Sequence, residues 1–525
     1  MYKLTNFIVG VVLAYFVVKY LSISEFLISF GQCLTINQIS YIHPDEHFQS
    51  LEILTQLFYG TKGTIPWEYN PENAARSYVP QLIFYGPIYY LFADVWQSQD
   101  AQALLLFVRM QNFTISFFTS LLLKSYIIPT PVNKRPKVTL YLITSYVAWT
   151  FQKHSFSNSI ETIILLTTIA TFTFQLKSAE KSHYMITIVQ GLLITLGIFN
   201  RMTFPAFILL PSIKLFCKYY LKHLKCFICL LITIGASTLA CVYVDTQIYG
   251  TNEPVIAPWN NLLYNMSVSN LSKHGLHPRY THILINIPQL VGPAIVYLIP
   301  YIKKDFKGWF TKLPNLSICS ALLLLSIFPH QELRFLIPIV PFICMQLPNI
   351  KSRWFFKLWI AFNTVMFIIM GVYHQSGVID TIISQRYFDE ENINVHLWWK
   401  TYSPPTWMYM NNNLTVSTTN FVDNVERIDS IDFNININHV IDLKGCDTQL
   451  TNDTITGFFD EDPKTVITLF YPTSVQSKVS EVLNRTDIQF KSKYYTRAHL
   501  DLDHFDMDDL STFMPGFNAI EISHI

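Results

Sequence analysis

Charged residues are scarce in this sequence, and their scarcity indicates the class of protein. Only 14% of the 525 residues are Asp, Glu, Lys or Arg, whereas soluble domains carry about 25%. Half of the residues are hydrophobic, and several runs are long and apolar enough to span a bilayer. A net charge of +1 argues against a nucleic-acid partner. The chain is therefore predicted to be an integral membrane protein.

Metal-binding and redox patterns are missing as well. The eight cysteines are scattered, and the Cys226-x-x-Cys229 pair lacks the second ligand pair of a zinc site. We therefore interpret this pair as a packed helix face. Cys33 and Cys446 are the only cysteines in polar segments. They are therefore the one pair that could face an oxidising lumen and form a disulfide bond. The sequence has no internal repeat and no low-complexity tract.

The charges that are present are divided unevenly. The chain before Asp380 has 27 basic and 14 acidic residues, whereas the remainder has 10 basic and 22 acidic residues. A basic membrane body therefore precedes an acidic, polar C-terminal part.

The hydrophobic runs predict an all-α, multi-pass membrane domain with about eleven transmembrane helices. Residues 4–24 form the first run, which we interpret as a retained anchor because it lacks a small-residue cleavage site. Residues 80–96 are interrupted by Gly86-Pro87, so we expect them to be re-entrant or interfacial. The other expected spans are 104–123, 138–150, 159–176, 185–200, 203–216, 226–244, 283–301, 314–328, 335–348 and 358–373.

The distribution of Lys and Arg orients these spans. Cytosolic connections are enriched in basic residues, and basic connections alternate here with connections that have few. Loops 25–79 and 245–282, the His330–Arg334 turn and the chain after residue 373 then fall on the lumenal side. The same lumenal segments contain N-glycosylation sequons, at Asn265, Asn270, Asn413, Asn452 and Asn484.

These features predict two domains. Residues 1–373 would form the transmembrane catalytic domain with its two lumenal loops, and residues 374–525 a lumenal C-terminal domain. In the second part, 440–443 and 466–470 are short β-rich runs that end in turn signals, and 474–484 has helical spacing. We therefore expect a small α/β domain.

The densest polar cluster follows the first hydrophobic run, where residues 43–52 read HPDEHFQSLE. Pro44 suits the first turn of a helix, and Asp45 and Glu46 would then lie beside its positive end. The helix would run to about Gly60, which suits a C-cap. We place the chemistry of the protein on this helix.

Five side chains of this cluster are candidate site residues. Asp45 and Glu46 are the candidate catalytic residues, and His43, His47 and Gln49 are candidate substrate ligands. We expect His43, Glu46 and His47 to face a cavity at the membrane surface. Two acids at a helix N-terminus are also common without any function, and the residues alone leave both interpretations open. A metal site is less favoured because no second carboxylate pair with ligand spacing occurs on the same side.

A second polar cluster, FPHQELRF at residues 328–335, lies between two apolar runs. Charged groups at a membrane boundary are costly and face a cavity or one another. Glu332 and Arg334 either simply pair within a short loop or take part in substrate binding together with His330. We favour the second interpretation, in which Arg334 and His330 donate to a phosphate or a sugar hydroxyl.

Two other lumenal segments supply further candidates for substrate binding. Trp67, Glu68 and Arg76 combine an aromatic ring with charged groups, as sugar sites do, although an interfacial aromatic belt is the favoured explanation from the residues alone. His277 and Arg279 lie in HGLHPRYTH, which suits either an anionic lipid head group or an ordinary surface loop.

Together these stretches resemble a known family. HPDEHFQSLE and the later HQELRFL turn are similar to the motifs of glycosyltransferase family 22, the dolichyl-phosphate-mannose-dependent α-mannosyltransferases of glycosylphosphatidylinositol (GPI) and N-glycan assembly. Within that family, GTIPWEY, ARSYVP, VDTQIYG, PWNNLLYN and HGLHPRYTHILINIPQLVGP most resemble the members that add the fourth, side-branching mannose of GPI. The family turn often reads HKEERF, so no role is carried over to Gln331 or Leu333.

The resemblance implies a multi-pass GT-C fold in the endoplasmic reticulum membrane, with a lumenal active site and no cofactor. The enzyme would transfer mannose, with inversion, from dolichyl phosphate mannose to the 2-hydroxyl of the third mannose of a trimannosyl-GPI precursor. An inverting transfer needs one general base for the acceptor hydroxyl, and Asp45 is our candidate. The leaving phosphate needs cations rather than an acid, and Arg334 and His330 are the candidates.

Two alternatives remain open. A sister enzyme would add the third GPI mannose or a mannose of the N-glycan precursor. A lipid transporter or flippase would instead have polar residues at mid-bilayer and paired broken helices, whereas the polar clusters here lie at expected lumenal edges.

Overall fold

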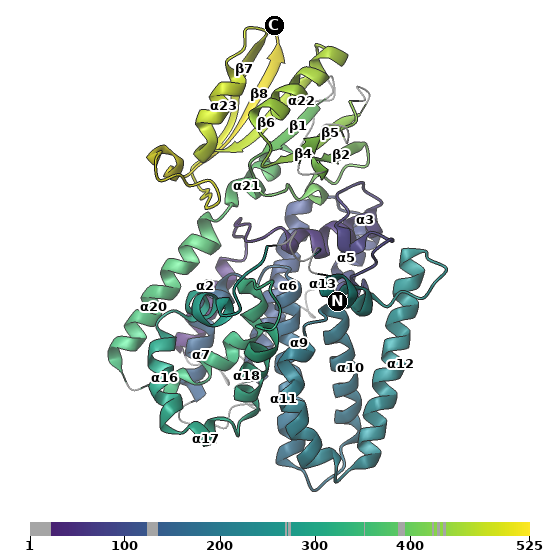
Figure 1. Cartoon of the computed structure of the whole chain (residues 1–525), viewed down its shortest axis with the longest axis vertical. Coiled ribbons are helices and arrows are strands. Elements are labelled where there is room, and N and C mark those ends of the chain that lie inside the picture. Colours follow the sequence, from purple (N-terminus) through teal and green to yellow (C-terminus); the bar gives the residue numbers. More distant parts are fainter. Residues whose placement is uncertain are drawn as a thin grey trace, which may run out of the picture. The chain divides into compact units, whose positions relative to one another are not determined.

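The computed structural model describes residues 23–122, 135–267, 270, 275–350, 352–386, 394–422, 425–427, 431–433 and 437–525. The chain divides into two compact units (Figure 1). Unit 1 comprises residues 1–37, 67–84 and 109–365, and unit 2 comprises residues 38–66, 85–108 and 366–525. Each unit therefore combines segments that are far apart in the sequence.

Unit 1 is helical, and its long helices lie side by side in Figure 1. Helix α10 packs between α9 and α12, and α11 packs against α9 and α18. A Cβ on Gly191 of α10 would lie 2.8 Å from the Thr233 side chain of α12, so this glycine permits the close approach of the two helices. The main helices of unit 1 are α2 (Ile23–Leu34), α7 (Arg135–Thr144), α9 (Ser157–Lys177), α10 (Tyr184–Asn200), α11 (Pro205–Leu215), α12 (Leu224–Tyr249), α13 (Ala257–Met266), α16 (Ala294–Lys304), α18 (Leu313–Leu325) and α20 (Arg353–Phe367).

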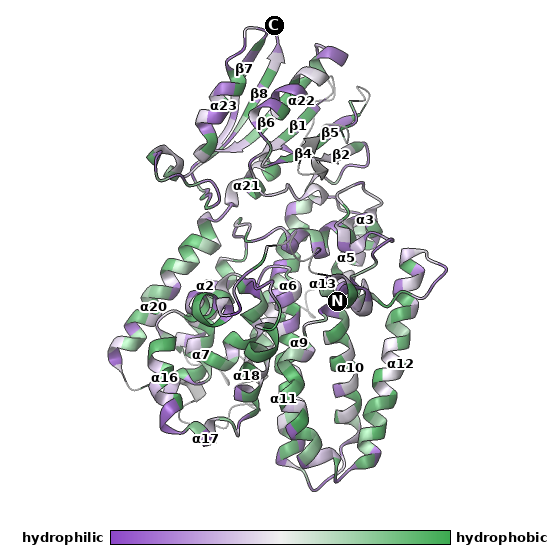
Figure 2. Ribbon diagram, viewed as in Figure 1, coloured by the Kyte–Doolittle hydropathy of each residue, from purple (hydrophilic) through white to green (hydrophobic). Residues whose placement is uncertain are grey.

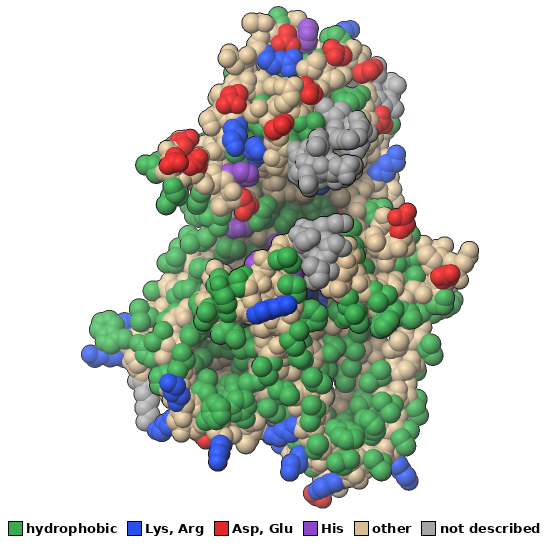
Figure 3. All heavy atoms as spheres, viewed as in Figure 1, with side chains coloured by type: hydrophobic (Ala, Val, Ile, Leu, Met, Phe, Trp, Pro, Cys, Tyr) green, Lys and Arg blue, Asp and Glu red, His purple; other side chains and the backbone are tan. Residues whose placement is uncertain are grey.

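Apolar side chains dominate the surface of these helices, as a membrane protein requires (Figures 2 and 3). By length and composition, three described helical segments can cross a bilayer: Ser157–Lys177, Leu224–Tyr249 and Arg353–Tyr373. A fourth candidate consists of His282–Val291 and Ala294–Lys304, which are bent by 113°. Many of the Lys and Arg side chains visible in Figure 3 gather near α17 (Phe306–Trp309) and at the lower ends of α11 and α12. The protein is therefore a helical membrane protein.

Several expected spans are interrupted. The expected span 283–301 is bent, because the chain turns at Gly292, whose φ of +48° favours glycine; His282–Val291 and Ala294–Lys304 form either one broken span or a re-entrant loop. The expected span 335–348 is instead a 3₁₀ helix, η8 (Leu333–Ile339), followed by the short α19 (Val340–Cys344). The expected run 138–150 is divided between α7 and α8 (Tyr146–Trp149). Residues 4–22 of the first expected run lie outside the described residues, whereas Ile23 and Ser24 begin α2. A count of eleven spans stays a prediction.

The interruption predicted at Gly86-Pro87 is confirmed. Helix α4 (Val79–Phe84) ends before it, and α5 (Gly86–Tyr90) begins with Pro87 in its first turn. A π-helical turn, η3 (Leu91–Val95), follows, and α6 (Ala101–Leu122) begins a few residues later.

Unit 2 contains the predicted α/β domain at the C-terminal end of the chain. Its six-stranded sheet has the order β2-β5-β1-β6-β8-β7. Strands β2, β5, β1 and β6 are parallel, whereas β8 runs antiparallel to both β6 and β7. The strands are β1 (Asn394–Trp399), β2 (Leu414–Thr418), β5 (Asn438–Lys444), β6 (Val466–Pro472), β7 (Ile488–Thr496) and β8 (Phe517–His524). Strands β5 and β6 and helix α23 (Gln476–Leu483) confirm the three elements expected from the sequence.

Alternation along the strands gives this sheet two buried faces. Leu397 and Leu469 point towards the face covered by α22 (Thr448–Glu461) and α23, where they share one core with Phe458 and Val479. On the opposite face, the Trp398 ring stacks on Phe470 with 4.3 Å between centroids. The 3₁₀ turn η11 (Thr406–Tyr409) and helix α21 (Ser376–Gln385) pack against each other, and α21 also packs against β8.

The cysteines do not pair. Cys33 and Cys446 are both free thiols, as are the other six cysteines. Cys446 is buried, and its Sγ lies 3.3 Å from the hydroxyl oxygen of Thr451. The disulfide bond considered for this pair is therefore absent from the structure.

Candidate active site

The helix predicted at residues 44–60 is present. The backbone N–H groups of His47 and Phe48 both donate to the carbonyl of Pro44 at 3.0 Å. The helix continues through α3 (Glu52–Tyr59) to Gly60, whose φ of 66° gives the expected left-handed C-cap. Residues His47–Leu51 form a π-helical turn, η1, which the sequence did not indicate. Turns of this kind are frequent at functional sites.

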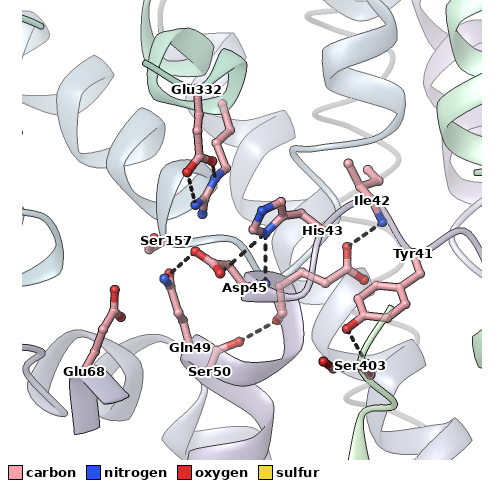
Figure 4. Close-up of polar contacts among 12 residues, drawn as sticks. Tyr41, Ile42, His43, Asp45, Gln49, Ser50, Glu68, Ser157, Glu332 and Ser403 are labelled. Atoms are coloured by element: carbon pink, nitrogen blue, oxygen red, sulfur yellow. Dashed lines mark hydrogen bonds and ion pairs between the residues drawn. The ribbon is translucent and has the colours of Figure 1, made fainter. Parts of the chain in front are cut away.

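Asp45 opens this helix and lies beside His43 and Gln49 (Figure 4). Its side chain is 21% exposed, and that of His43 is 36% exposed. The Gln49 amide donates to the Asp45 carboxylate, and the Asp45 backbone N–H donates to His43 Nδ1 at 3.1 Å. The structure thus brings together three of the predicted site residues around one partly exposed carboxylate.

Glu46 and His47 point into the interior instead. They are 1% and 0% exposed, and His47 Nε2 lies 2.9 Å from Glu46 Oε1. Trp407 donates its indole N–H to His47 Nδ1 at 3.1 Å, and the Tyr41 ring packs edge-on against the imidazole. The expectation that both side chains face a cavity is therefore wrong, because tertiary packing against Trp407 and Tyr41 buries them. In this structure they support the helix.

Glu52 is the charged residue of this motif that had no role assigned from the sequence. Its carboxylate accepts a hydrogen bond from the Thr406 hydroxyl and another from the Trp407 backbone N–H at 2.9 Å. Complete burial raises the pKa of Glu52 to about 7, against the opposing effect of these hydrogen bonds. The carboxylate joins the Asp45 helix to the turn η11, 354 residues away in the sequence.

Tyr41 fixes the position of the chain just before the Asp45 helix. Its hydroxyl donates to the Ser403 carbonyl at 2.9 Å, and its own carbonyl lies 2.9 Å from His374 Nδ1. Its backbone N–H donates to the His374 carbonyl at 3.0 Å. Two segments of the C-terminal half thus hold the approach to Asp45 within unit 2.

The HQELRF turn of unit 1 contains a compact charge cluster. His330 Nε2 lies 2.7 Å from Glu332 Oε1, and the Arg334 guanidinium donates to both oxygens of the same carboxylate. Burial opposes protonation of His330, but the hydrogen bond and charge of Glu332 outweigh it and raise the pKa of His330. The pairing of Glu332 with Arg334, one of the two interpretations of this turn, is present.

The HGLHPRYTH segment packs against this turn. The His277 backbone N–H donates to the Pro329 carbonyl at 2.7 Å, and Arg279 donates to the Ile327 carbonyl. Gln331 is 1% exposed and accepts from the His282 backbone N–H at 2.9 Å. Two motifs that suggested the family are therefore neighbours, and Gln331 has a structural role that the sequence analysis did not assign.

A buried ion pair beside the turn was missed. Arg201 Nε lies 3.2 Å from Glu161 Oε2, and Arg201 also donates to the Ser157 hydroxyl at 3.0 Å. The guanidinium carbons of Arg201 and Arg334 lie 5.1 and 5.6 Å from the centroid of the same Phe335 ring. The sequence did contain a signal for this pair: Arg201 follows one apolar run, and Glu161 lies within another. A charged residue in a membrane-spanning run is a functional-site candidate by default.

Trp67, Glu68 and Arg76 belong to unit 1, and each side chain has a partner there. Arg76 Nε lies 2.5 Å from Glu68 Oε2, and Arg76 also donates to the Asn200 carbonyl at 3.3 Å. The Trp67 ring stacks on Tyr264 with 3.9 Å between centroids. Glu68 and Arg76 are therefore paired with each other, and Trp67 belongs to an aromatic pair.

Among the sequon asparagines, Asn413 and Asn484 are exposed, whereas Asn265, Asn270 and Asn452 are partly buried. Within the described ranges, no group of three or more His, Cys, Asp or Glu side chains is arranged to hold a metal ion. The absence of a metal from the reaction stays a prediction.

We expect Glu52→Gln to flatten the pH dependence of stability. A folded pKa of about 7, above the ordinary 4.5, means that folding favours the protonated carboxyl, so wild-type stability falls as pH rises between these values. The fall amounts to about 3 kcal/mol. Thermal unfolding of the detergent-solubilised protein between pH 5 and 8 measures it, with the exposed Glu481→Gln as control. A Glu52→Gln profile that parallels the wild type would contradict the assignment.

The comparisons with known proteins agree on one family. Residues 22–411 match the model of the Alg9-like mannosyltransferase family. GPI mannosyltransferase 4 of Saccharomyces cerevisiae is 44% identical, over 92% of this chain and 95% of its own. The proteins of the same name from Candida glabrata and Eremothecium gossypii are 43% and 41% identical, over 89% and 92% of this chain and 93% and 96% of their own. The chain therefore belongs to the Alg9-like mannosyltransferase family, and it is a membrane-bound glycosyltransferase.

Proposed function

We propose that this enzyme is an α-1,2-mannosyltransferase of GPI-anchor biosynthesis, which adds a fourth mannose to the third mannose of a trimannosyl-GPI precursor. The observation that carries the proposal is the 44% identity to a GPI mannosyltransferase 4 over nearly the whole chain. The donor would be dolichyl phosphate mannose, and the protein would be a GT-C enzyme of the endoplasmic reticulum membrane. Positive-inside topology and the sequons support a lumenal active site.

Asp45 is the proposed general base. An inverting displacement needs a carboxylate that accepts the proton of the acceptor hydroxyl as the new glycosidic bond forms. Its partial exposure lets a substrate reach it, and the Gln49 amide orients it. Glu46, the other catalytic candidate, would act through His47 as a positioning residue.

Arg334 and His330 are the proposed ligands of the leaving dolichyl phosphate, and Arg201 joins them. The phosphate departs with its negative charge already present, so it needs fixed cations rather than a proton donor. The guanidinium groups of Arg201 and Arg334 both lie within cation–π distance of the Phe335 ring. Glu161 forms an ion pair with Arg201, and Glu332 forms one with Arg334. Held in this way, the two guanidinium groups lose little conformational freedom when a phosphate binds.

The acceptor is tested in cells that lack the protein. We expect their microsomes to accumulate the trimannosyl-GPI intermediate, and re-expression of the wild-type chain to convert it to the tetramannosyl form. Chromatography of mannose-labelled glycolipids measures both species. Accumulation of a dimannosyl GPI, or of a truncated N-glycan precursor, would assign the enzyme to a sister reaction instead.

Asp45→Asn tests the general base. We expect mannose transfer to fall by about 10² to 10⁴-fold, the usual contribution of such a base, while expression and membrane insertion are retained. Asp94→Asn removes an exposed carboxylate of the same unit and should leave the rate unchanged. Wild-type turnover in Asp45→Asn would reject the assignment.

Arg334→Ala tests the phosphate ligand. Loss of one charge-assisted hydrogen bond predicts a rise of about 10 to 100-fold in the donor concentration needed for half-maximal rate, or a stop of turnover. Lys222→Ala breaks an exposed ion pair with Glu180 and serves as the matched control. An unaltered dependence on dolichyl phosphate mannose in Arg334→Ala would remove this residue from the donor site.

A further inference from the structure

Unit 1 contains a surface hollow next to Trp67 that the proposed mechanism does not use. Its volume is about 290 Å³, and it lies between the 67–75 segment and helix α13. The stacked rings of Trp67 and Tyr264, 24° apart in plane, form its aromatic wall. Pockets for drug-sized ligands begin at about 300 Å³, so this hollow suits a single small ring.

Three other lining side chains, those of Glu72, Asn73 and Asn260, can accept hydrogen bonds. Asn73 donates its side-chain N–H to the Trp67 carbonyl, and Asn260 donates its own to the Ala74 carbonyl, both at 3.1 Å. Each amide is thereby oriented, with its Oδ1 atom left to accept from a ligand hydroxyl. Glu72 adds an exposed carboxylate. Since the described residues lining the hollow include no Lys or Arg, this lining favours a neutral ligand with many hydroxyls over a phosphate.

Hydrogen bonds and an ion pair outside the hollow fix the backbone of the segment that lines it. Besides the Glu68–Arg76 ion pair, the Tyr249 hydroxyl donates to the Arg76 carbonyl at 2.6 Å. The Tyr78 backbone N–H donates to the Asp245 carboxylate at 2.9 Å. These bonds tie the segment to α12 and preorganise the aromatic wall, which lowers the cost of binding.

We propose that this hollow is a saccharide subsite that binds one hexose of the acceptor glycolipid other than the one that receives mannose. The apolar face of a pyranose would lie on the aromatic wall, and its hydroxyls would donate to Glu72 and the two asparagines. Both segments of the hollow belong to loops whose sequence predicts a lumenal location, as it does for Asp45. Contacts with such a remote sugar supply binding energy for positioning the reacting one. The inference rests on the proposed function for the identity of the ligand.

Trp67→Phe and Glu72→Gln test the subsite with small changes at one partly exposed and one exposed position. We expect each to lower kcat/KM for the trimannosyl-GPI acceptor about tenfold, the loss of one good contact, with the KM for dolichyl phosphate mannose unaltered. Glu253→Gln removes an exposed carboxylate of the same unit outside the hollow and should match the wild type. Wild-type acceptor kinetics in both test variants would overturn the proposal.

Asn265 provides a second control, because it is a sequon residue next to Tyr264. If the protein's own glycan filled the hollow, Asn265→Gln would raise kcat/KM for the acceptor, and the proposal would be wrong. We expect no change.

Binding is also measured without turnover, so that failure of the subsite and failure of the proposed function are distinguishable. We expect saturation-transfer NMR on the full-length Asp45→Asn protein to detect soluble α-linked mannotriose, and the signal to disappear when Trp67→Phe and Glu72→Gln are added. Equal signals with and without these two changes would overturn the subsite even if the enzyme transfers mannose. Loss of the mannotriose signal in the triple variant would support the subsite even if the natural acceptor were not a GPI precursor.

Discussion

The buried carboxylate of Glu52 is the interaction on which the candidate catalytic helix depends. A carboxylate removed from water must be hydrogen-bonded or protonated, and Glu52 receives bonds from Thr406 and the Trp407 backbone. The same turn donates to His47 through the Trp407 indole. The helix that carries Asp45 is thus fixed by residues from the C-terminal half of the chain, which gives that half a structural role in unit 2.

A similar principle organises unit 1. Three of its buried or partly buried arginines lie against carboxylates, in the pairs Glu68–Arg76, Glu161–Arg201 and Glu332–Arg334. Breaking one such pair is costly because it leaves an uncompensated charge. These pairs therefore fix the positions of the three guanidinium groups within unit 1.

Local signals in the sequence predicted local structure well. Pro44 and Gly60 indicated the two ends of the candidate catalytic helix, and the β-rich runs at 440–443 and 466–470 became strands β5 and β6, which pair with the two sides of β1. The number of transmembrane helices was harder to predict from the sequence. Hydropathy measures the length of an apolar run, but it does not show that Gly292 breaks one run or that a 3₁₀ turn replaces another.

The sequence by itself determined the membrane class, the family and the stretch in which the chemistry is sought, because composition and contiguous motifs are properties of neighbouring residues. Only the tertiary structure decided which side chains of that stretch are accessible. Asp45 stays partly exposed, Glu46 and His47 turn inward, and Glu52 binds a turn 354 residues away. The physical reason is that burial and pairing arise from contacts between distant segments, and no pattern along the chain specifies which segments will meet.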